Sequence, residues 1–229
     1  MKILALDTST ATASLAVCDD GAVLAEAGLE IGRRRGERLA QAIAFLLETV
    51  GLKPADLQAY TVGLGPGSFS GLRGGLALMK GLALAHPRPL VGVSSLEALA
   101  ASAVGFRGLV LPVLDAHQGE VYAAVFEVGG AGLPERRTPD LALSPQRLRE
   151  LAAGPVLILG EGLKKHGPAI AAALPAAWLA PPLCWPPRAA WVAALAAPRL
   201  ARGEEDPLDP LVPLYVRSSD AELRLGPRR

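Results

Sequence analysis

Short apolar runs alternate with turn residues through the first half of the chain, and this pattern predicts strands and helices in a regular order. The runs that predict strands are Lys2–Asp7, Ala13–Cys18, Ala22–Leu29, Ala59–Leu64 and Leu90–Val93. Helical spacing of apolar residues replaces them over Gly36–Val50, over a stretch ending near Ala85, and from Ser94 or Ser95 to about Ala103. Asp19-Asp20-Gly21 predicts a tight hairpin turn. This order of elements predicts an α/β domain with a mixed sheet.

Near residue 108 the pattern of the first two strands begins again. Leu109–Ala116 reads as a strand with Asp115 near its end, as Asp7 ends the first strand, and Gly119–Val128 follows it as a second strand. Two similar openings at domain spacing indicate a duplicated unit with a cleft between the halves, although two unrelated strand pairs can also look alike. We therefore divide the chain into residues 1–107 and 108–229.

The pattern is weaker in the second half. It predicts helices at Ser144–Leu151, Lys164–Ala173 and Arg188–Ala201, strands at Val156–Leu159 and Leu214–Val216, and a proline-rich loop over Leu174–Pro187.

Composition narrows the class of protein. Of the 229 residues, 51% are hydrophobic and the formal net charge is +1, which excludes a disordered chain and argues against unaided nucleic-acid binding. Cys18 and Cys184 lie far apart in apolar runs, so we expect two buried thiols and a reducing, cytoplasmic setting. We expect no secretory signal at the N-terminus, and no membrane span, because prolines interrupt the longest uncharged stretch.

The turn after the first strand carries polar groups that suit an anion or a metal. Asp7 is followed by Thr8, Ser9 and Thr10, whose hydroxyls and backbone amides are groups that hold phosphate, while a carboxylate can hold a metal-bound water. Equally, such a turn can satisfy its own backbone, and from this hairpin alone that interpretation is favoured.

A second candidate is the glycine-rich turn before the second helix, in the sequence LGPGSFSGLRGG. Gly65 and Gly67 permit a close backbone approach, and Ser68 or Ser70 can cap the following helix, whose N-terminus favours an anion. The spacing matches neither a Walker A loop nor a dinucleotide fingerprint. A plain strand-to-helix turn explains the residues as well as an anion site does.

The helix after this turn is apolar on nearly every side. It carries a ridge of small residues, Gly74, Leu78, Gly81 and Ala85, along which another helix can pack closely. The preceding predicted helix places Phe45 on its otherwise polar side. We interpret these residues as a partner-binding surface, the alternative being burial under the chain's own second half.

The sequence gives little support for a catalytic or metal site of the chain's own. The three histidines, His86, His117 and His166, form neither HxxxH nor HExxH, and no serine has the GxSxG spacing of a nucleophile elbow. We predict no catalytic residue and no metal ligand.

Three stretches in order resemble one protein family. They are KILALDTSTATASLAV at residues 2–17, GLGPGSFSGLRGGLALMKGLAL at 63–84 and LDAHQGEVYAAVF at 114–126, and PLYVRS at 213–218 resembles that family's C-terminal strand. The family is TsaB, formerly YeaZ. The resemblance implies the duplicated actin-like ATPase fold shared with sugar kinases and Hsp70, related to ribonuclease H, with a reduced second half here.

The resemblance also implies a function. TsaB proteins act in making threonylcarbamoyladenosine at position 37 of tRNAs that read codons starting with A. There they are the non-catalytic partner of the transferase TsaD, joined by the ATPase TsaE. Members pair with TsaD or with themselves through the two N-terminal helices. The resemblance also implies that such a chain contacts tRNA only as part of the complex. No cofactor of the chain's own is implied, although ATP can enter at the level of the complex.

On this basis we expect two sets of site residues. The partner interface comprises Leu39, Phe45, Arg73, Gly74, Leu78 and Gly81. A vestigial phosphate or nucleotide cleft comprises Asp7, Ser9, Thr10, Gly65, Gly67, Ser68 and Asp115.

One departure from the family pattern bears on activity. Where the family often has a histidine followed by serine or threonine, this chain has Arg35-Gly36, which argues against a metal-dependent peptidase. The alternative function is an ATP-binding kinase or ATPase that uses Asp7 and Asp115 to place a metal–nucleotide at the cleft.

Overall fold

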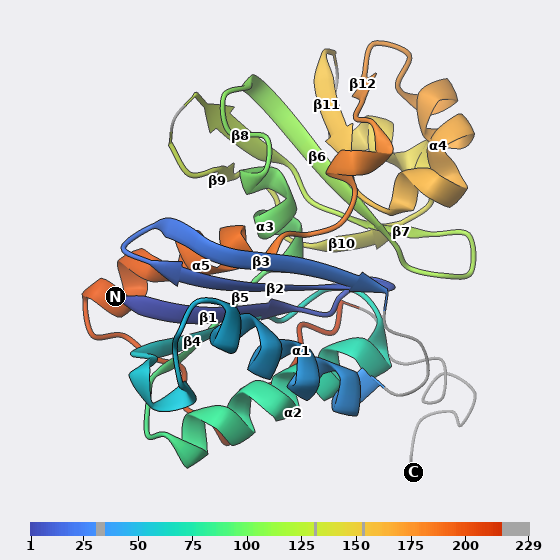
Figure 1. Cartoon of the computed structure of the whole chain (residues 1–229). Coiled ribbons are helices and arrows are strands. Elements are labelled where there is room, and N and C mark those ends of the chain that lie inside the picture. The colour runs from blue at the N-terminus through green and yellow to red at the C-terminus, as the bar shows by residue number, and fades with distance from the viewer. Residues whose placement is uncertain (31–34, 131, 153, 217–229) are drawn as a thin grey trace.

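The computed structural model describes residues 1–30, 35–130, 132–152 and 154–216. Figure 1 shows two β-sheets, one built by the first part of the chain and one by the second, with helices around both. No helix in these ranges is long and apolar enough to cross a membrane.

The first sheet has five strands in the order β3-β2-β1-β4-β5. They are β1 (Lys2–Asp7), β2 (Thr12–Asp19), β3 (Ala22–Glu30), β4 (Ala59–Gly63) and β5 (Leu90–Val93), which confirms all five predicted strands. Neighbours among β1, β2 and β3 are antiparallel, whereas β4 and β5 continue the sheet in parallel. The predicted hairpin turn is confirmed by left-handed backbone at Asp20 and Gly21, with φ of 46° and 82°.

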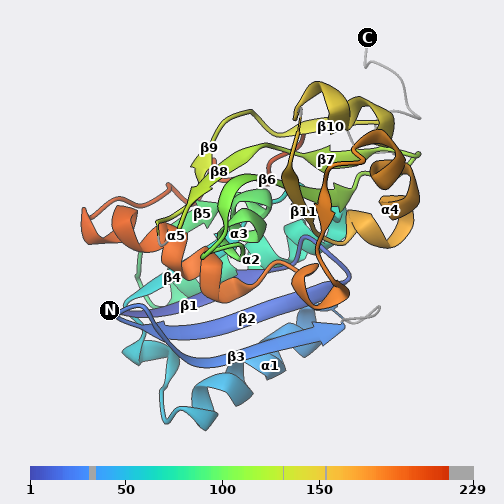
Figure 2. The same cartoon turned by 90° about the horizontal axis from the view of Figure 1, so that it is seen from above.

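Helices cover both faces of this sheet. On one face lie α1 (Arg35–Thr49) and α2 (Phe69–Ala85), which pack against Leu4 of β1. On the other lies α5 (Ala189–Ala201), which reaches the sheet from the far end of the chain and packs against Ile3. Figure 2 shows α5 across the strands of the first sheet. Because side chains alternate between the faces of a strand, burial on both sides explains why β1 is continuously apolar.

The second sheet is arranged around β6 (Arg107–Asp115). Its order is β10-β7-β6-β11-β12, with β8 beside β6 and β9 beside β8. These strands are β7 (Val121–Ala123), β8 (Phe126–Gly129), β9 (Glu135–Arg136), β10 (Leu141–Leu143), β11 (Val156–Leu159) and β12 (Trp178–Leu179). Like β1, β6 ends in an aspartate and lies between an antiparallel and a parallel neighbour, β7 and β11. The two halves therefore repeat one strand arrangement, as the sequence predicted.

The remaining helices connect and cover the second sheet. α3 (Ser95–Ala101) lies between the two sheets and packs against β6, β8 and α5. α4 (Gly162–Ala173) packs against β6 and β7. Because α3 contributes buried side chains to the core of the second sheet, a hydrophobic layer joins the two halves.

Three predictions about elements were wrong. The strand predicted over Gly119–Val128 is two short strands, because the Val125 N–H donates to the Thr138 hydroxyl (2.8 Å) rather than to a neighbouring strand. The helix predicted over Ser144–Leu151 is a 3₁₀ helix, Pro145–Glu150. Leu214–Val216 forms no strand, and the Leu214 N–H makes a single bond to the Leu64 carbonyl (2.8 Å). Residues 217 and 218 of the PLYVRS motif lie outside the described residues.

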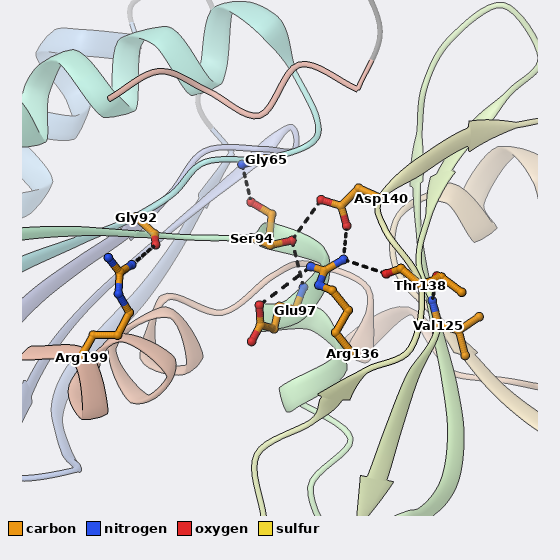
Figure 3. A network of polar contacts seen from close by, with 10 residues as sticks. Gly65, Gly92, Ser94, Glu97, Val125, Arg136, Thr138, Asp140 and Arg199 are labelled. Carbon is orange, nitrogen blue, oxygen red and sulfur yellow. Dashed lines mark hydrogen bonds and ion pairs between the residues drawn. The ribbon is translucent and has the colours of Figure 1, made fainter. Parts of the chain in front are cut away.

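Polar contacts also link the halves. Arg136 of β9 lies 3.8 Å from the Glu97 carboxylate of α3 and pairs with Asp140 at 2.5 Å (Figure 3). The Ser94 hydroxyl, which caps α3 through the Glu97 N–H, lies 3.5 Å from Asp140. The division of the chain into two domains between residues 107 and 108 stays a prediction. α5 belongs to the second half of the sequence but packs with the sheet of the first half.

The cysteines differ from expectation. Cys18 is buried, and burial raises the pKa of its thiol to about 11, with a smaller effect of the nearby Glu26 carboxylate. Cys184 is exposed, so the prediction of two buried thiols was wrong. The apolar residues around Cys184 belong to a short 3₁₀ helix on the surface, Pro182–Cys184.

Candidate functional site

Asp7 ends β1 inside the protein, with 1% of its surface exposed. Its Oδ1 accepts hydrogen bonds from the backbone N–H (2.8 Å) and the hydroxyl (2.6 Å) of Ser9, and its Oδ2 accepts one from the Ser95 hydroxyl (2.6 Å). Burial raises the pKa of the Asp7 carboxyl, and these hydrogen bonds only partly offset that effect. The carboxylate thus joins the end of β1 to the start of α3.

The glycine-rich turn packs directly onto this aspartate turn. The Ser68 N–H donates to the Ser9 carbonyl (2.7 Å), and a Cβ on Gly67 would lie 2.2 Å from that same carbonyl oxygen. Gly65 accepts from the Ser95 N–H (2.7 Å) and donates to the Ser95 hydroxyl (3.1 Å). As predicted, Ser68 caps α2, its hydroxyl accepting from the Gly71 N–H. The structure therefore brings together the predicted residues Asp7, Ser9, Gly65, Gly67 and Ser68.

Asp115 occupies the matching place at the end of β6 and has its own partners. Its carboxylate lies 3.0 Å from Nε2 of the buried His166 and 3.3 Å from the Lys165 ammonium, and it accepts from the His117 N–H (3.1 Å). Burial acts to raise the pKa of Asp115, but the bonds from His166, His117 and Lys165 outweigh it and lower that pKa overall. No local motif joins residue 115 to residues 165 and 166, so these partners were missed.

Thr10 contacts the second half of the chain through Glu161, the residue that precedes α4. The Glu161 carboxylate lies against the Thr10 side chain and the Ala11 backbone N–H, and burial raises its pKa. The Glu161 carboxylate thus accepts from the Ala11 backbone N–H, a donor that the turn would otherwise offer to a phosphate.

These arrangements do not fit a metal–nucleotide. Both oxygens of Asp7 already have donors, and Asp115 is paired with Lys165 and His166. In the part of the chain that the structure describes, no three His, Cys, Asp or Glu side chains gather as a metal site would need. Nucleotide binding at these residues stays a prediction.

The predicted partner surface is open to solvent. Gly74 and Gly81 are exposed on α2, and a Cβ on either would meet no atom within 4 Å, so no part of the described chain covers this ridge. Phe45 of α1 and Leu84 of α2 are each 67% exposed. The described part of the second half therefore does not bury this ridge, contrary to the alternative interpretation.

A groove runs between α1 and α2. It has a volume of about 540 Å³, and its mainly apolar lining includes Ala40, Ile43, Ala44, Leu47, Leu78 and Leu82. Leu78 is half-buried and packs against the core, and Leu39 is 1% exposed within that core. Leu39 therefore supports the α1–α2 face from below, whereas the other predicted interface residues lie on it or at its edge.

At the N-terminal end of α2 the predicted interface residue Arg73 joins two aromatic rings. Its guanidinium carbon lies 4.0 Å from the centre of the Phe69 ring, and its Nε donates to the Tyr215 hydroxyl (2.9 Å). The two ring centres are 5.4 Å apart. Phe69 and Tyr215 were not predicted as functional, because only the fold brings the end of the described chain to α2.

Comparison with known proteins identifies the family. The family model described as TsaD, tRNA N6-adenosine threonylcarbamoyltransferase, matches residues 30–177, more than half of the chain. The tRNA threonylcarbamoyladenosine biosynthesis protein TsaB of Bacillus subtilis is 38% identical over 72% of this chain and 73% of its own length. The chain belongs to the TsaB family. TsaB of Escherichia coli is 36% identical over 66% of this chain and 65% of its own length.

Solved structures agree with membership of the TsaB family. YeaZ from Pseudomonas aeruginosa superposes with a TM-score of 0.78 at 28% identity, covering 94% of this chain and all of its own. Component A of (R)-2-hydroxyglutaryl-CoA dehydratase from Acidaminococcus fermentans superposes with a TM-score of 0.55 at 13% identity, covering 88% of this chain and 99% of its own. This likeness shows a shared fold alone. The predicted actin-like fold is confirmed.

Proposed function

We propose that this TsaB-family chain takes part in tRNA threonylcarbamoyladenosine biosynthesis as a non-catalytic subunit that docks on a TsaD transferase through α1 and α2. The curated relatives are named for that biosynthesis, and the family model that matches the chain is that of the transferase. The observation that carries the proposal is the open α1–α2 face, where Phe45 and Leu84 are exposed and two glycines of α2 have free space above them. Large exposed apolar groups beside a groove are typical of protein-binding surfaces.

The rest of the proposal follows the family resemblance. The modified base is adenosine 37 of tRNAs that read codons starting with A. The complex recruits TsaE and contacts tRNA. The free chain pairs with itself through α1 and α2. The chain needs no cofactor of its own, and ATP enters at the level of the complex. The hydrogen bonds that already engage Asp7 favour this scaffold role over the alternative kinase or ATPase.

The docking test is Gly74→Trp, which places an indole on the ridge. Gly74 has open space around it, so we expect the variant to fold normally while its complex with the TsaD subunit weakens at least about a hundredfold. Gly167→Trp is the matched control, because Gly167 is also a helical glycine with no atom within 4 Å of an added Cβ but lies on α4. Leu78→Arg is less informative, since half-buried Leu78 packs on the core.

The functional test is a reconstitution that leaves out one protein at a time. Unmodified tRNA, TsaD, TsaE and the adenylate-forming enzyme are incubated with wild type, with Gly74→Trp, or without this chain, and modified adenosine is measured by nucleoside mass spectrometry. We expect product with wild type and Gly167→Trp, and little with Gly74→Trp. Equal product without the chain would contradict the scaffold role.

A further inference from the structure

The cluster of Phe69, Arg73 and Tyr215 lies at one end of the proposed docking face, and we name it the Arg73 platform. Phe69 and Tyr215 are 37% and 44% exposed, and Arg73 is exposed as well. Arg73 lies one residue before Gly74 and on the same side of α2 as Ala77 and Leu84, which follow Arg73 by four and eleven positions on that exposed helix face. The platform is therefore continuous with the ridge.

The fold holds this platform in place. Stacking on Phe69 and the bond from Nε to the Tyr215 hydroxyl fix the guanidinium plane. Tyr215 is in turn held by its neighbours, because the Leu214 N–H bonds to the Leu64 carbonyl, Pro213 is buried and Leu211 packs against the first core. An arginine fixed in this way loses little side-chain entropy when it binds a ligand.

Charge indicates what the platform binds. Its one described hydrogen bond uses Nε, and among the described residues no carboxylate forms an ion pair with Arg73. The first turn of α2 carries no acidic residue. Within the described residues both terminal nitrogens of Arg73 are available, and such a planar guanidinium favours a carboxylate bound by two parallel hydrogen bonds.

We propose that the Arg73 platform receives an aspartate or glutamate of the TsaD-type partner and sets the register of its docking along α2. This inference rests on the proposed function. The α1–α2 face that Arg73 shares carries exposed Phe45 and Leu84, and the groove between the two helices is lined mainly by apolar residues. That setting suits a protein carboxylate better than the phosphates of RNA, which call for several basic residues together.

The test measures the affinity of the full-length chain for the TsaD subunit by calorimetry at low and high salt. Arg73→Glu should weaken binding about ten- to a hundredfold, and Arg73→Gln should weaken it less and reduce the salt dependence. Arg73→Lys should also weaken binding, because an ammonium neither stacks on Phe69 nor binds a carboxylate through two bonds. Arg107→Glu, the same charge change at an exposed site on β6, should leave affinity within about twofold.

The outcomes separate this inference from the proposed function. If wild type binds the TsaD subunit and Arg73→Glu binds as tightly as Arg107→Glu, the inference is overturned while the docking role stands. If wild type forms no complex, the proposed function fails first. If Arg73→Glu weakens only self-association, Arg73 contacts a second copy of the chain. If it weakens only tRNA binding by the free chain, Arg73 contacts RNA. Either result would overturn the proposal. Recovery of Arg73→Glu binding by one Asp→Arg or Glu→Arg reversal on the partner would support it.

Discussion

Asp7 shows how burial changes the role of a single residue. A carboxylate at the end of the first strand is open to two interpretations in the sequence, a ligand for a metal-bound water or the centre of a turn. In the structure it accepts three hydrogen bonds from Ser9 and Ser95 and is almost fully buried. The residue therefore connects two elements that are far apart in the sequence.

This environment predicts a pH dependence of stability. Burial raises the pKa of Asp7 in the folded protein, so the folded chain binds this proton more tightly than the unfolded chain does. The contribution of Asp7 to the free energy of unfolding is therefore greatest at low pH and falls as pH rises through and above the ordinary aspartate range. Asp7→Asn removes the titrating group, so the stability of wild type relative to the variant should fall as the pH rises from about 4 toward neutral.

The measurement is urea unfolding of both proteins across that pH range. Asp209→Asn, at an exposed carboxylate, is the control and should leave the pH profile of wild type unchanged. Parallel profiles for wild type and Asp7→Asn would show that the folded state does not raise the pKa of Asp7.

At the scale of elements, α2 uses its glycines in two different ways. Gly75 faces inward, where an added Cβ would lie 2.2 Å from the Thr8 hydroxyl oxygen. That hydroxyl donates to the Gly71 carbonyl of α2 (2.8 Å), so the helix lies directly on the turn after β1. Gly74, the preceding residue, faces open space.

Substitution by alanine should separate the two roles. Gly75→Ala should destabilise the protein by about 1–3 kcal/mol, because Thr8 and α2 have to move apart. Gly74→Ala should be neutral or stabilise it by up to about 1 kcal/mol, because alanine is the better helix former. Urea unfolding of both variants measures the difference, and equal stabilities would mean that α2 does not lie close to Thr8.

At the scale of the whole molecule, the fold depends on a helix from the end of the chain. α5 packs across the first sheet, where its Ala193 and Ala196 share a core with Ile3 and Val91. On this face of the first sheet, residues 1–107 supply Ala98 of α3 to the core, and the other buried helical residues come from α5.

A buried charge tests this arrangement. Ala196 is completely buried, so Ala196→Asp should destabilise the protein by more than about 3 kcal/mol, or prevent folding, because the carboxylate has no partner there. Ala201→Asp, at an exposed position of the same helix, should cost less than about 1 kcal/mol. Thermal unfolding of the two variants measures the contrast, and a cooperative transition near that of wild type in Ala196→Asp would place α5 away from the sheet.

The sequence by itself determined the strands of the first sheet, helices α1 and α2 and the repeated aspartate-ended strand. Each of these follows from residues within one turn or one strand, where side-chain spacing reports directly which face is buried. The tertiary structure alone decided the bonds of Asp7 to Ser95 and of Asp115 to His166, the burial of Leu39, the path of α5 and the meeting of Tyr215 with Arg73. These contacts join segments tens of residues apart, and a local pattern carries no information about which distant segment covers it.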